Sequence, residues 1–174
     1  YTEMVIHVTD SDRTIRDLLA NEEAMIKAAQ AITEEARLYN GVNLNFEGLG
    51  YLDEGLELQA VQDHFTTFVQ LLSRHLKAAN CPLTLTLHAP NSAYKGYNYQ
   101  PLGALADQII IMAYDYGKRP EPVSLVKQAV EMAVAVIPPH KVILGISAPS
   151  ESGESITSKV GIAKRYNLGG IALW

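Results

Sequence analysis

The chain has 174 residues, of which 48% are hydrophobic and 19% charged, so it can bury a sizeable core and lacks the composition of a disordered protein. Its 14 Lys and Arg residues against 19 Asp and Glu residues give a net charge of −5, and no basic run favours nucleic acid as a partner. The single cysteine, Cys81, excludes an intrachain disulfide and a cysteine-based zinc site, and no apolar run has the length of a membrane span.

Apolar runs of strand length alternate with segments of helical periodicity along the chain. In chain order, the pattern predicts a strand at 5–8, a helix near 22–39 that follows the N-cap Asn21, a strand at 42–46, a helix near 56–79, strands at 83–87 and 108–113, a helix over 123–137, a strand at 142–146, a weaker helix near 155–165 and a strand at 170–173. Such alternation implies parallel strands joined by right-handed crossovers. The predicted fold class is therefore α/β, either an open doubly wound sheet or a closed barrel.

The number of strands bears on which of these two architectures the chain adopts. Six strands are predicted, whereas a closed (β/α)8 TIM barrel has eight and takes about 250 residues. We therefore expect residues 1–174 to form a single domain that corresponds to strands 3 to 8 of a TIM barrel and lacks the first two β/α units. No linker, low-complexity segment or internal repeat marks a domain boundary.

The most informative segment runs from Asn40 to Glu47. Alternation along a strand places its apolar residues on one face and Asn43, Asn45 and Glu47 on the other. Strands of parallel sheets are usually apolar on both faces, and burying an unpaired amide costs about 1–3 kcal/mol, so this polar row needs partners. Two interpretations stay open: the residues bond one another or a ligand, or the segment is an edge strand with one face in water.

Polar or aromatic residues also lie at the carboxyl ends of three other predicted strands. His88 follows a strand of alternating leucine and threonine, Tyr114 and Asp115 follow the run at 108–113, and Trp174 follows the last strand. Chemistry in α/β folds is carried out at this end of the strands. A closed barrel would therefore gather these side chains and Glu47 around one mouth.

Each of these residues can also be explained by a role in the fold alone, without a ligand. Trp174 can be a core or terminal residue, Tyr114 a buried phenol bonded to the backbone, and Asp115 a helix or turn cap. For His88, a satisfied interior histidine is the better interpretation. The loop that follows it either lines a carbohydrate groove or forms a tyrosine-rich turn; its polar and aromatic residues are Asn91, Ser92, Tyr94, Tyr97 and Tyr99.

Three motifs resemble glycoside hydrolase family 18, the chitinase-like barrels. The segment Asn40-Gly41-Val42-Asn43-Leu44-Asn45-Phe46-Glu47 is similar to the family's Asp-Gly-x-Asp-x-Asp-x-Glu motif on strand four. Met112-Ala113-Tyr114-Asp115 is similar to its Met-x-Tyr-Asp motif on strand six, and Trp174 to the tryptophan that ends strand eight. The matches come in the family's order and cover residues 40–174. The segment Arg119-Pro120-Glu121-Pro122 resembles bacterial members associated with spores and cell walls, which implies a secreted, cell-wall or spore location.

The resemblance implies a retaining glycosidase that works by substrate assistance and needs one carboxyl group and no cofactor. Glu47 would protonate the glycosidic oxygen, the 2-acetamido group of the substrate would attack the anomeric carbon, and Glu47 would then activate water. Tyr114 would bond the acetamido oxygen, Asp115 would orient the sugar and Trp174 would stack beneath it. Asn43, Met112 and His88 complete the expected substrate-binding set. The implied substrate contains β-linked N-acetylglucosamine, as in chitin or peptidoglycan.

The chain departs from the family motif at one position that matters for chemistry. Asn45 stands where the family has an aspartate that stabilises positive charge on the acetamido nitrogen, and an amide supplies no net charge. The alternative hypothesis is accordingly a catalytically impaired glycan-binding protein of the same fold. A metal-dependent α/β hydrolase is disfavoured because no two histidines have metal-site spacing; they are His7, His64, His75, His88 and His140. The sequence leaves the oligomeric state open.

Overall fold

The computed structural model describes residues 1–174, which form one parallel six-stranded sheet in the order β1-β2-β3-β4-β5-β6. The strands are β1 (Glu3–Thr9), β2 (Gly41–Glu47), β3 (Leu83–His88), β4 (Gln108–Met112), β5 (Val142–Ile146) and β6 (Gly170–Leu173). All five neighbouring pairs are parallel. The six predicted strands are confirmed within two residues at each end. Because the strand order never reverses, the sheet is not doubly wound.

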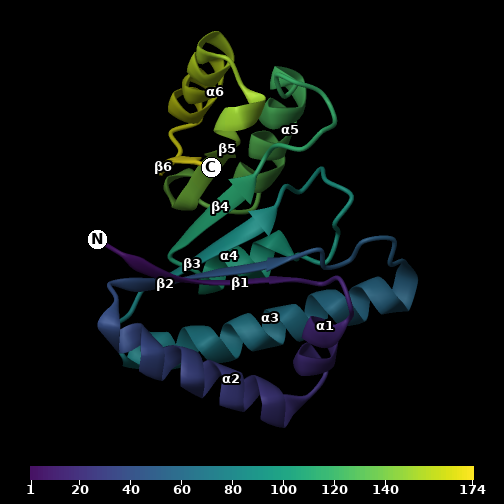
Figure 1. The fold of residues 1–174 in the computed structure, drawn as a ribbon, viewed down its shortest axis with the longest axis vertical. Coiled ribbons are helices and arrows are strands. Elements are labelled where there is room, and N and C mark those ends of the chain that lie inside the picture. Colours follow the sequence, from purple (N-terminus) through teal and green to yellow (C-terminus); the bar gives the residue numbers. More distant parts are fainter.

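Helices connect the strands and cover the sheet from outside. They are α1 (Thr14–Leu19), α2 (Glu22–Glu35), α3 (Gly55–Ala78), α4 (Tyr99–Leu105), α5 (Val123–Val134) and α6 (Gly153–Arg165), with short 3-10 turns at Ala36–Leu38, Pro139–Lys141 and Ala148–Ser150. Figure 1 shows a curved sheet with α2 and α3 below its first strands and α5 and α6 above its last, with the N-terminus at the left and the C-terminus next to β6. The parallel sheet with outer helices is the arrangement expected for part of a TIM barrel.

The four predicted helices are confirmed, with differences at the ends of α2 and α5; α5 ends at Val134, three residues before the predicted end. Asn21 caps this helix, since its side-chain oxygen accepts from the backbone N–H of Ala24 at 3.0 Å. The helix ends at Glu35, and a 3-10 turn continues it to Leu38. The short helices α1 and α4 were not predicted, because six or seven residues are too few to establish helical periodicity.

The polar row on β2 lies inside the molecule. β2 pairs with β1 on one side and β3 on the other, so the interpretation of an edge strand with one face in water is wrong. Asn43 is 7% exposed and accepts from the hydroxyl of Thr86 at 2.8 Å, and the hydroxyl of Thr84 donates to Glu3 at 2.7 Å. Partners on neighbouring strands therefore offset the cost of burying these polar groups.

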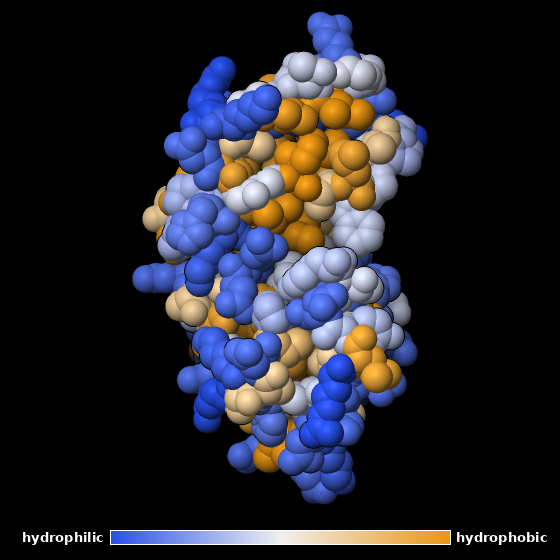
Figure 2. Space-filling model, turned by 90° about the vertical axis from the view of Figure 1, so that its left-hand side faces the viewer, coloured by the Kyte–Doolittle hydropathy of each residue, from blue (hydrophilic) through white to orange (hydrophobic).

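Apolar side chains are exposed at the two edges of the sheet. Val5 on β1 is 55% exposed, and Ile171 and Leu173 on β6 are 39% and 60% exposed. Figure 2 shows apolar residues gathered in the upper half of the face that it draws, the half in which Figure 1 places β6, α5 and α6. No helix combines the length and apolar composition that crossing a bilayer requires.

Candidate active site

A cavity of about 510 Å³ lies at the carboxyl ends of β2, β3 and β4. Five predicted site residues line it together: Glu47, His88, Met112, Tyr114 and Asp115. The remaining wall comes from the loops after β2, β3 and β4, with Tyr51, Asn91, Ser92, Ala93, Tyr94 and Tyr116. The loops after β2 and β3 meet at a bridge between Tyr51 and Tyr94, whose ring centroids are 5.2 Å apart. The cavity thus lies at the end of the sheet where α/β enzymes bind their substrates.

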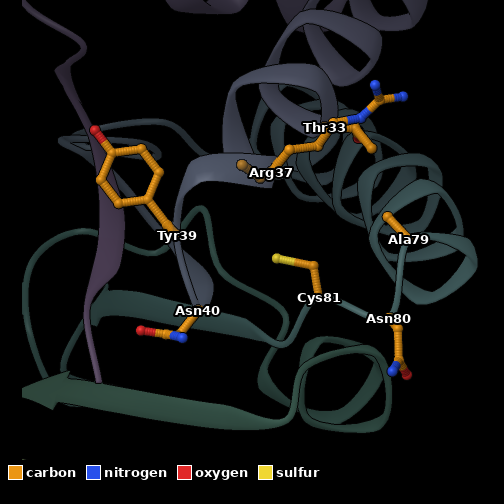
Figure 3. Close-up of a pocket in the computed structure, with 8 residues that line it drawn as sticks. Thr33, Arg37, Tyr39, Asn40, Ala79, Asn80 and Cys81 are labelled. Carbon is orange, nitrogen blue, oxygen red and sulfur yellow. The ribbon is translucent and has the colours of Figure 1, made fainter.

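A second cavity of about 380 Å³ lies at the opposite, amino end of β2 and β3. Figure 3 shows its wall, which comes from the end of α2 with its following turn and from the turn after α3, with the thiol of Cys81 pointing into the space between them. None of the predicted site residues lines this cavity. In barrel folds this end of the strands contributes to stability rather than to chemistry.

Glu47 ends β2 with its carboxyl group between two partners. Its Oε1 accepts from the side-chain Nδ2 of Asn45 at 2.8 Å and lies 3.2 Å from Nε2 of His7. The side chain of Glu47 is 27% exposed and that of His7 is 54% exposed. The carboxyl group of Glu47 is therefore held by side chains and remains accessible from the cavity.

Sequence reasoning missed His7 as a neighbour of Glu47. The residue lies opposite Asn45 in the parallel register of β1 and β2, so its imidazole falls on the same face as the polar row. The signal was available, because Val5, His7 and Thr9 occupy alternate positions and share a face. It could be recognised only once β1 was known to pair directly with β2.

Asn45 is 3% exposed, and only one of the two polar atoms of its side-chain amide has a hydrogen-bond partner. Its Nδ2 donates to Glu47, whereas its Oδ1 is buried and has no hydrogen-bond partner in the protein. An unpaired buried carbonyl oxygen costs about 1–3 kcal/mol. The site therefore contains, beside the carboxyl group of Glu47, a buried carbonyl oxygen that no group of the protein satisfies.

Tyr114 and Asp115 follow β4 in a constrained turn. Burial raises the pKa of the Tyr114 phenol well above its usual value, and the carboxylates of Glu47 and Asp115 raise it further, so the phenol stays neutral and able to donate. Asp115 has a φ of 62°, in the left-handed region. A Cβ at Gly145 on β5 would lie 3.2 Å from a ring carbon of Tyr114, so a glycine here leaves room for the phenol.

The loop after β3 combines both roles that its sequence left open. Asn91, Ser92 and Tyr94 line the cavity. Tyr97 and Tyr99 are buried, and their hydroxyls donate to the backbone oxygens of Phe46 and His88 at 2.7 Å each. The loop is thus partly cavity wall and partly a support for the ends of β2 and β3.

His88 shows features of an interior histidine although it lines the cavity. Its ring stacks on Tyr94 with the centroids 3.9 Å apart. Burial lowers the pKa of its imidazole, while the carboxylates of Glu47 and Asp115 act in the opposite direction. A neutral, stacked imidazole suits a wall that contacts a ligand through its face or edge.

Three predicted site residues lie outside the cavity wall: Asn43, Asn45 and Trp174. Asn43 is buried on the same face of β2 as Asn45, two residues earlier, and accepts a hydrogen bond from the hydroxyl of Thr86. Trp174 is 52% exposed beyond the end of β6, where its backbone N–H donates to the carbonyl of Ile146 at 3.0 Å. The structure therefore joins five of the predicted residues in one cavity, places Asn45 directly behind Glu47, and leaves Trp174 at the edge of the sheet.

Comparisons with known proteins show that the chain is similar to a sporulation-specific glycosylase, a spore cortex-lytic enzyme and chitinases. No protein-family model matches it. It is 29% identical over 148 residues to a protein described as a sporulation-specific glycosylase, YdhD of Bacillus subtilis, covering 78% of this chain and 33% of that protein. The crystal structure of YdhD matches with a TM-score of 0.69 and 26% identity, over 82% of this chain and 50% of the other. The chain thus spans about a third of the length of the curated relative it matches.

Two further crystal structures match nearly the whole chain. The spore cortex-lytic enzyme SleL of Bacillus megaterium gives a TM-score of 0.82 at 17% identity, over 99% of this chain and 56% of SleL. A class V chitinase of Pseudomonas fluorescens gives 0.80 at 17% identity, over 99% of this chain and 76% of the chitinase. These comparisons confirm that residues 1–174 have a chitinase-like α/β fold of the kind found in glycoside hydrolase family 18.

Proposed function

We propose that this protein is a glycosidase of the family 18 type that cleaves β-linked glycans containing N-acetylglucosamine, with Glu47 as its general acid. One observation carries the proposal. The carboxyl group of Glu47 lies at the carboxyl end of β2, bonded to Asn45, and faces a cavity that it shares with Tyr114 and Asp115. The similarity to a sporulation-specific glycosylase and the fold shared with chitinases support the same reaction class.

The proposed reaction needs one carboxyl group from the protein. Glu47 protonates the glycosidic oxygen as the bond to the anomeric carbon breaks, and the carbonyl oxygen of the substrate's 2-acetamido group attacks that carbon from the other face. Glu47, now ionised, takes a proton from water, which opens the oxazolinium-like intermediate and restores the original configuration. This sequence uses Glu47 first as acid and then as base.

The neighbouring residues bind the acetamido group and the sugar in this proposal. The neutral phenol of Tyr114 donates to the acetamido oxygen, and Asn45 orients the carboxyl group of Glu47 through its hydrogen bond of 2.8 Å. Asp115 orients the sugar hydroxyls, and Met112 and His88 form the cavity wall.

We further propose that the six strands are strands 3 to 8 of a (β/α)8 barrel in the full-length protein. The relatives that match 99% of this chain extend beyond it, and β1 and β6 both leave apolar side chains exposed. Two additional β/α units would cover these edges and bring the end of β6, with Trp174, around to the cavity. Spore-associated relatives support peptidoglycan as a substrate and a spore or cell-wall location.

The second candidate function, glycan binding without turnover, is favoured by Asn45. Its amide donates a hydrogen bond to Glu47 and brings no negative charge next to the developing oxazolinium. Glu47 is present in both hypotheses, so only a measurement of turnover separates them. We propose slow hydrolysis as the first hypothesis, because the acid itself is retained and accessible.

The decisive experiment compares Glu47→Gln with the parent in the full-length protein on N-acetylated oligosaccharides. Glutamine keeps the shape but has no proton to transfer, so hydrolysis should fall below detection while binding stays within about tenfold. Glu54→Gln is the matched control, since Glu54 is exposed just before α3 and its side chain makes no capping bond. Equal turnover by Glu47→Gln and the parent would remove Glu47 from the mechanism.

A further inference from the structure

Three buried charged side chains lie behind the turn that follows β4. Glu121 is 3% exposed and Lys159 on α6 is 1% exposed, and the side chain of Glu151 is 1% exposed. Lys159 is paired with Glu151. Buried ions cost several kcal/mol each unless they are paired or hydrogen-bonded, so this cluster requires compensation within the protein. Glu121 forms no ion pair with a cation and needs another source of stabilisation.

Backbone N–H groups of the candidate active site stabilise the buried carboxylate of Glu121. Oε1 of Glu121 accepts from the N–H of Asp115 at 3.1 Å, and Oε2 accepts from the N–H of Tyr116 at 3.0 Å. A carboxylate that accepts backbone hydrogen bonds is stabilised in its charged form. The two oxygens therefore hold two consecutive peptide groups in one orientation, directly after Tyr114.

This two-point contact matters because the turn is conformationally costly. Asp115 has a φ of 62°, and the left-handed conformation is unfavourable for a residue with a side chain. Such a conformation persists only where surrounding contacts impose it. The bonds to Glu121 fix the peptide groups on both sides of the Asp115 side chain, which lines the cavity.

Glu121 lies next to the ion pair between Glu151 and Lys159 of α6. Burial raises the pKa of the Glu151 carboxyl, the hydrogen bond from Lys159 lowers it, and the backbone of Glu121 is among the groups that help to lower it. On the other side, the hydroxyl of Tyr116 donates to Oδ1 of Asn91 at 2.8 Å, and Asn91 also lines the cavity. Hydrogen bonds therefore run from Glu121 to the turn and on to the loop after β3.

We propose that Glu121 is a positioning residue for the glycan site, which holds Asp115 and the adjacent Tyr114 in the conformation that binds an acetamido sugar. The role rests on the proposed function for the identity of the ligand. Glu121 lies six residues beyond Asp115 and outside the cavity lining, so it acts through the backbone of the turn and does not touch the sugar.

The test compares Glu121→Gln with the parent in the full-length protein by two readouts. The first is hydrogen exchange at the backbone amides of Asp115 and Tyr116, which should become about tenfold faster because glutamine offers one acceptor oxygen in place of two. The second is the affinity for tetra-N-acetylchitotetraose by calorimetry, which should weaken about tenfold. Glu154→Gln is the control, since Glu154 is exposed in the first turn of α6 and both readouts should match the parent.

The outcomes separate this proposal from the proposed function. If the parent does not bind the tetrasaccharide, the proposed function fails, and a positioning role toward such a ligand fails with it. If the parent binds but exchange at the two amides is the same in Glu121→Gln, Glu121 does not hold the turn. Faster exchange with unchanged affinity overturns the link to binding. Should Glu121→Gln not fold, Glu121→Asp keeps the charge with a shorter reach, and both changes should again appear, at about threefold.

Discussion

Replacing Asn45 with aspartate separates a slow glycosidase from a glycan-binding protein. In the structure, the amide nitrogen of Asn45 donates to Oε1 of Glu47 at 2.8 Å, and its Oδ1 is buried without a partner. The substitution replaces the donor with a carboxylate oxygen at the same short distance from Glu47. Two carboxyl groups this close share one proton, so the pair titrates as a unit and one pKa is raised.

The size of this effect follows from the distance between the two oxygens. Two unit charges separated by 2.8 Å repel by about 6 kcal/mol at an effective dielectric constant of ~20. One pKa unit corresponds to about 1.4 kcal/mol, so the repulsion is large enough to keep one proton on the pair at neutral pH. The shared proton makes Glu47 available as an acid, and the new charge stabilises the oxazolinium. We expect turnover to rise about tenfold or more.

The same substitution should change the pH dependence of stability with a defined sign. A carboxyl group whose pKa is higher in the folded than in the unfolded protein makes the folded state bind more protons. The free energy of unfolding of Asn45→Asp should therefore fall relative to the parent as pH rises above about 4, the ordinary aspartate value. Urea unfolding at pH 4 and pH 7 measures this difference, and a larger deficit at pH 4 contradicts the reasoning.

The assay compares initial rates of the full-length parent and Asn45→Asp on an N-acetylated oligosaccharide and its deacetylated counterpart. The gain should be confined to the acetylated substrate, because the other cannot form the intermediate. Asn43→Asp is the matched control: it adds the same charge on the same face of β2, next to Thr86 instead of Glu47. Equal rates for the parent and Asn45→Asp on the acetylated substrate, or an equal gain from Asn43→Asp, refute the proposed role.

Three further substitutions test the site and its support. Trp174→Ala should weaken oligosaccharide binding to the full-length protein by about 1–2 kcal/mol if the indole stacks on a sugar, and equal affinities by calorimetry rule this out. Tyr97→Phe removes a buried hydroxyl that donates to the carbonyl of Phe46 on β2 and accepts from the N–H of Leu49 just after it. The free energy of unfolding measured in urea should fall by about 1–3 kcal/mol, and no change means that these bonds are dispensable. Gly145→Ala places a Cβ 3.2 Å from Tyr114 and 2.8 Å from a backbone oxygen, so turnover and stability should both fall; a variant with parental rates shows that β5 tolerates the methyl group.

The sequence predicted the sheet well, because each strand carries a local signal. The alternation of polar and apolar residues in β2 and β3 identified both the strands and the face that leads to the cavity. The cavity residues Glu47, Tyr114 and Asp115 were predicted for the same reason, since a parallel sheet places all strand ends of one kind at one edge.

The unpredicted features depend on contacts between distant segments. His7 is recognisable as a neighbour of Glu47 only through the register of β1 against β2. Glu121 lies in an irregular loop, and nothing in its local pattern shows that its carboxylate accepts from the backbone of Asp115. Trp174 is absent from the cavity wall because it follows β6, two strands beyond the β4 edge of the cavity in the assembled sheet.

The uninterrupted strand order has a consequence for how such a molecule assembles and evolves. Each of the six strands pairs, within this sheet, only with its predecessor and its successor along the chain, so none of these five pairings has to wait for a segment synthesised much later. The sheet can lengthen one β/α unit at a time during translation. Units gained or lost at either edge by recombination would leave the existing strand pairs, and the cavity between β2 and β4, in place.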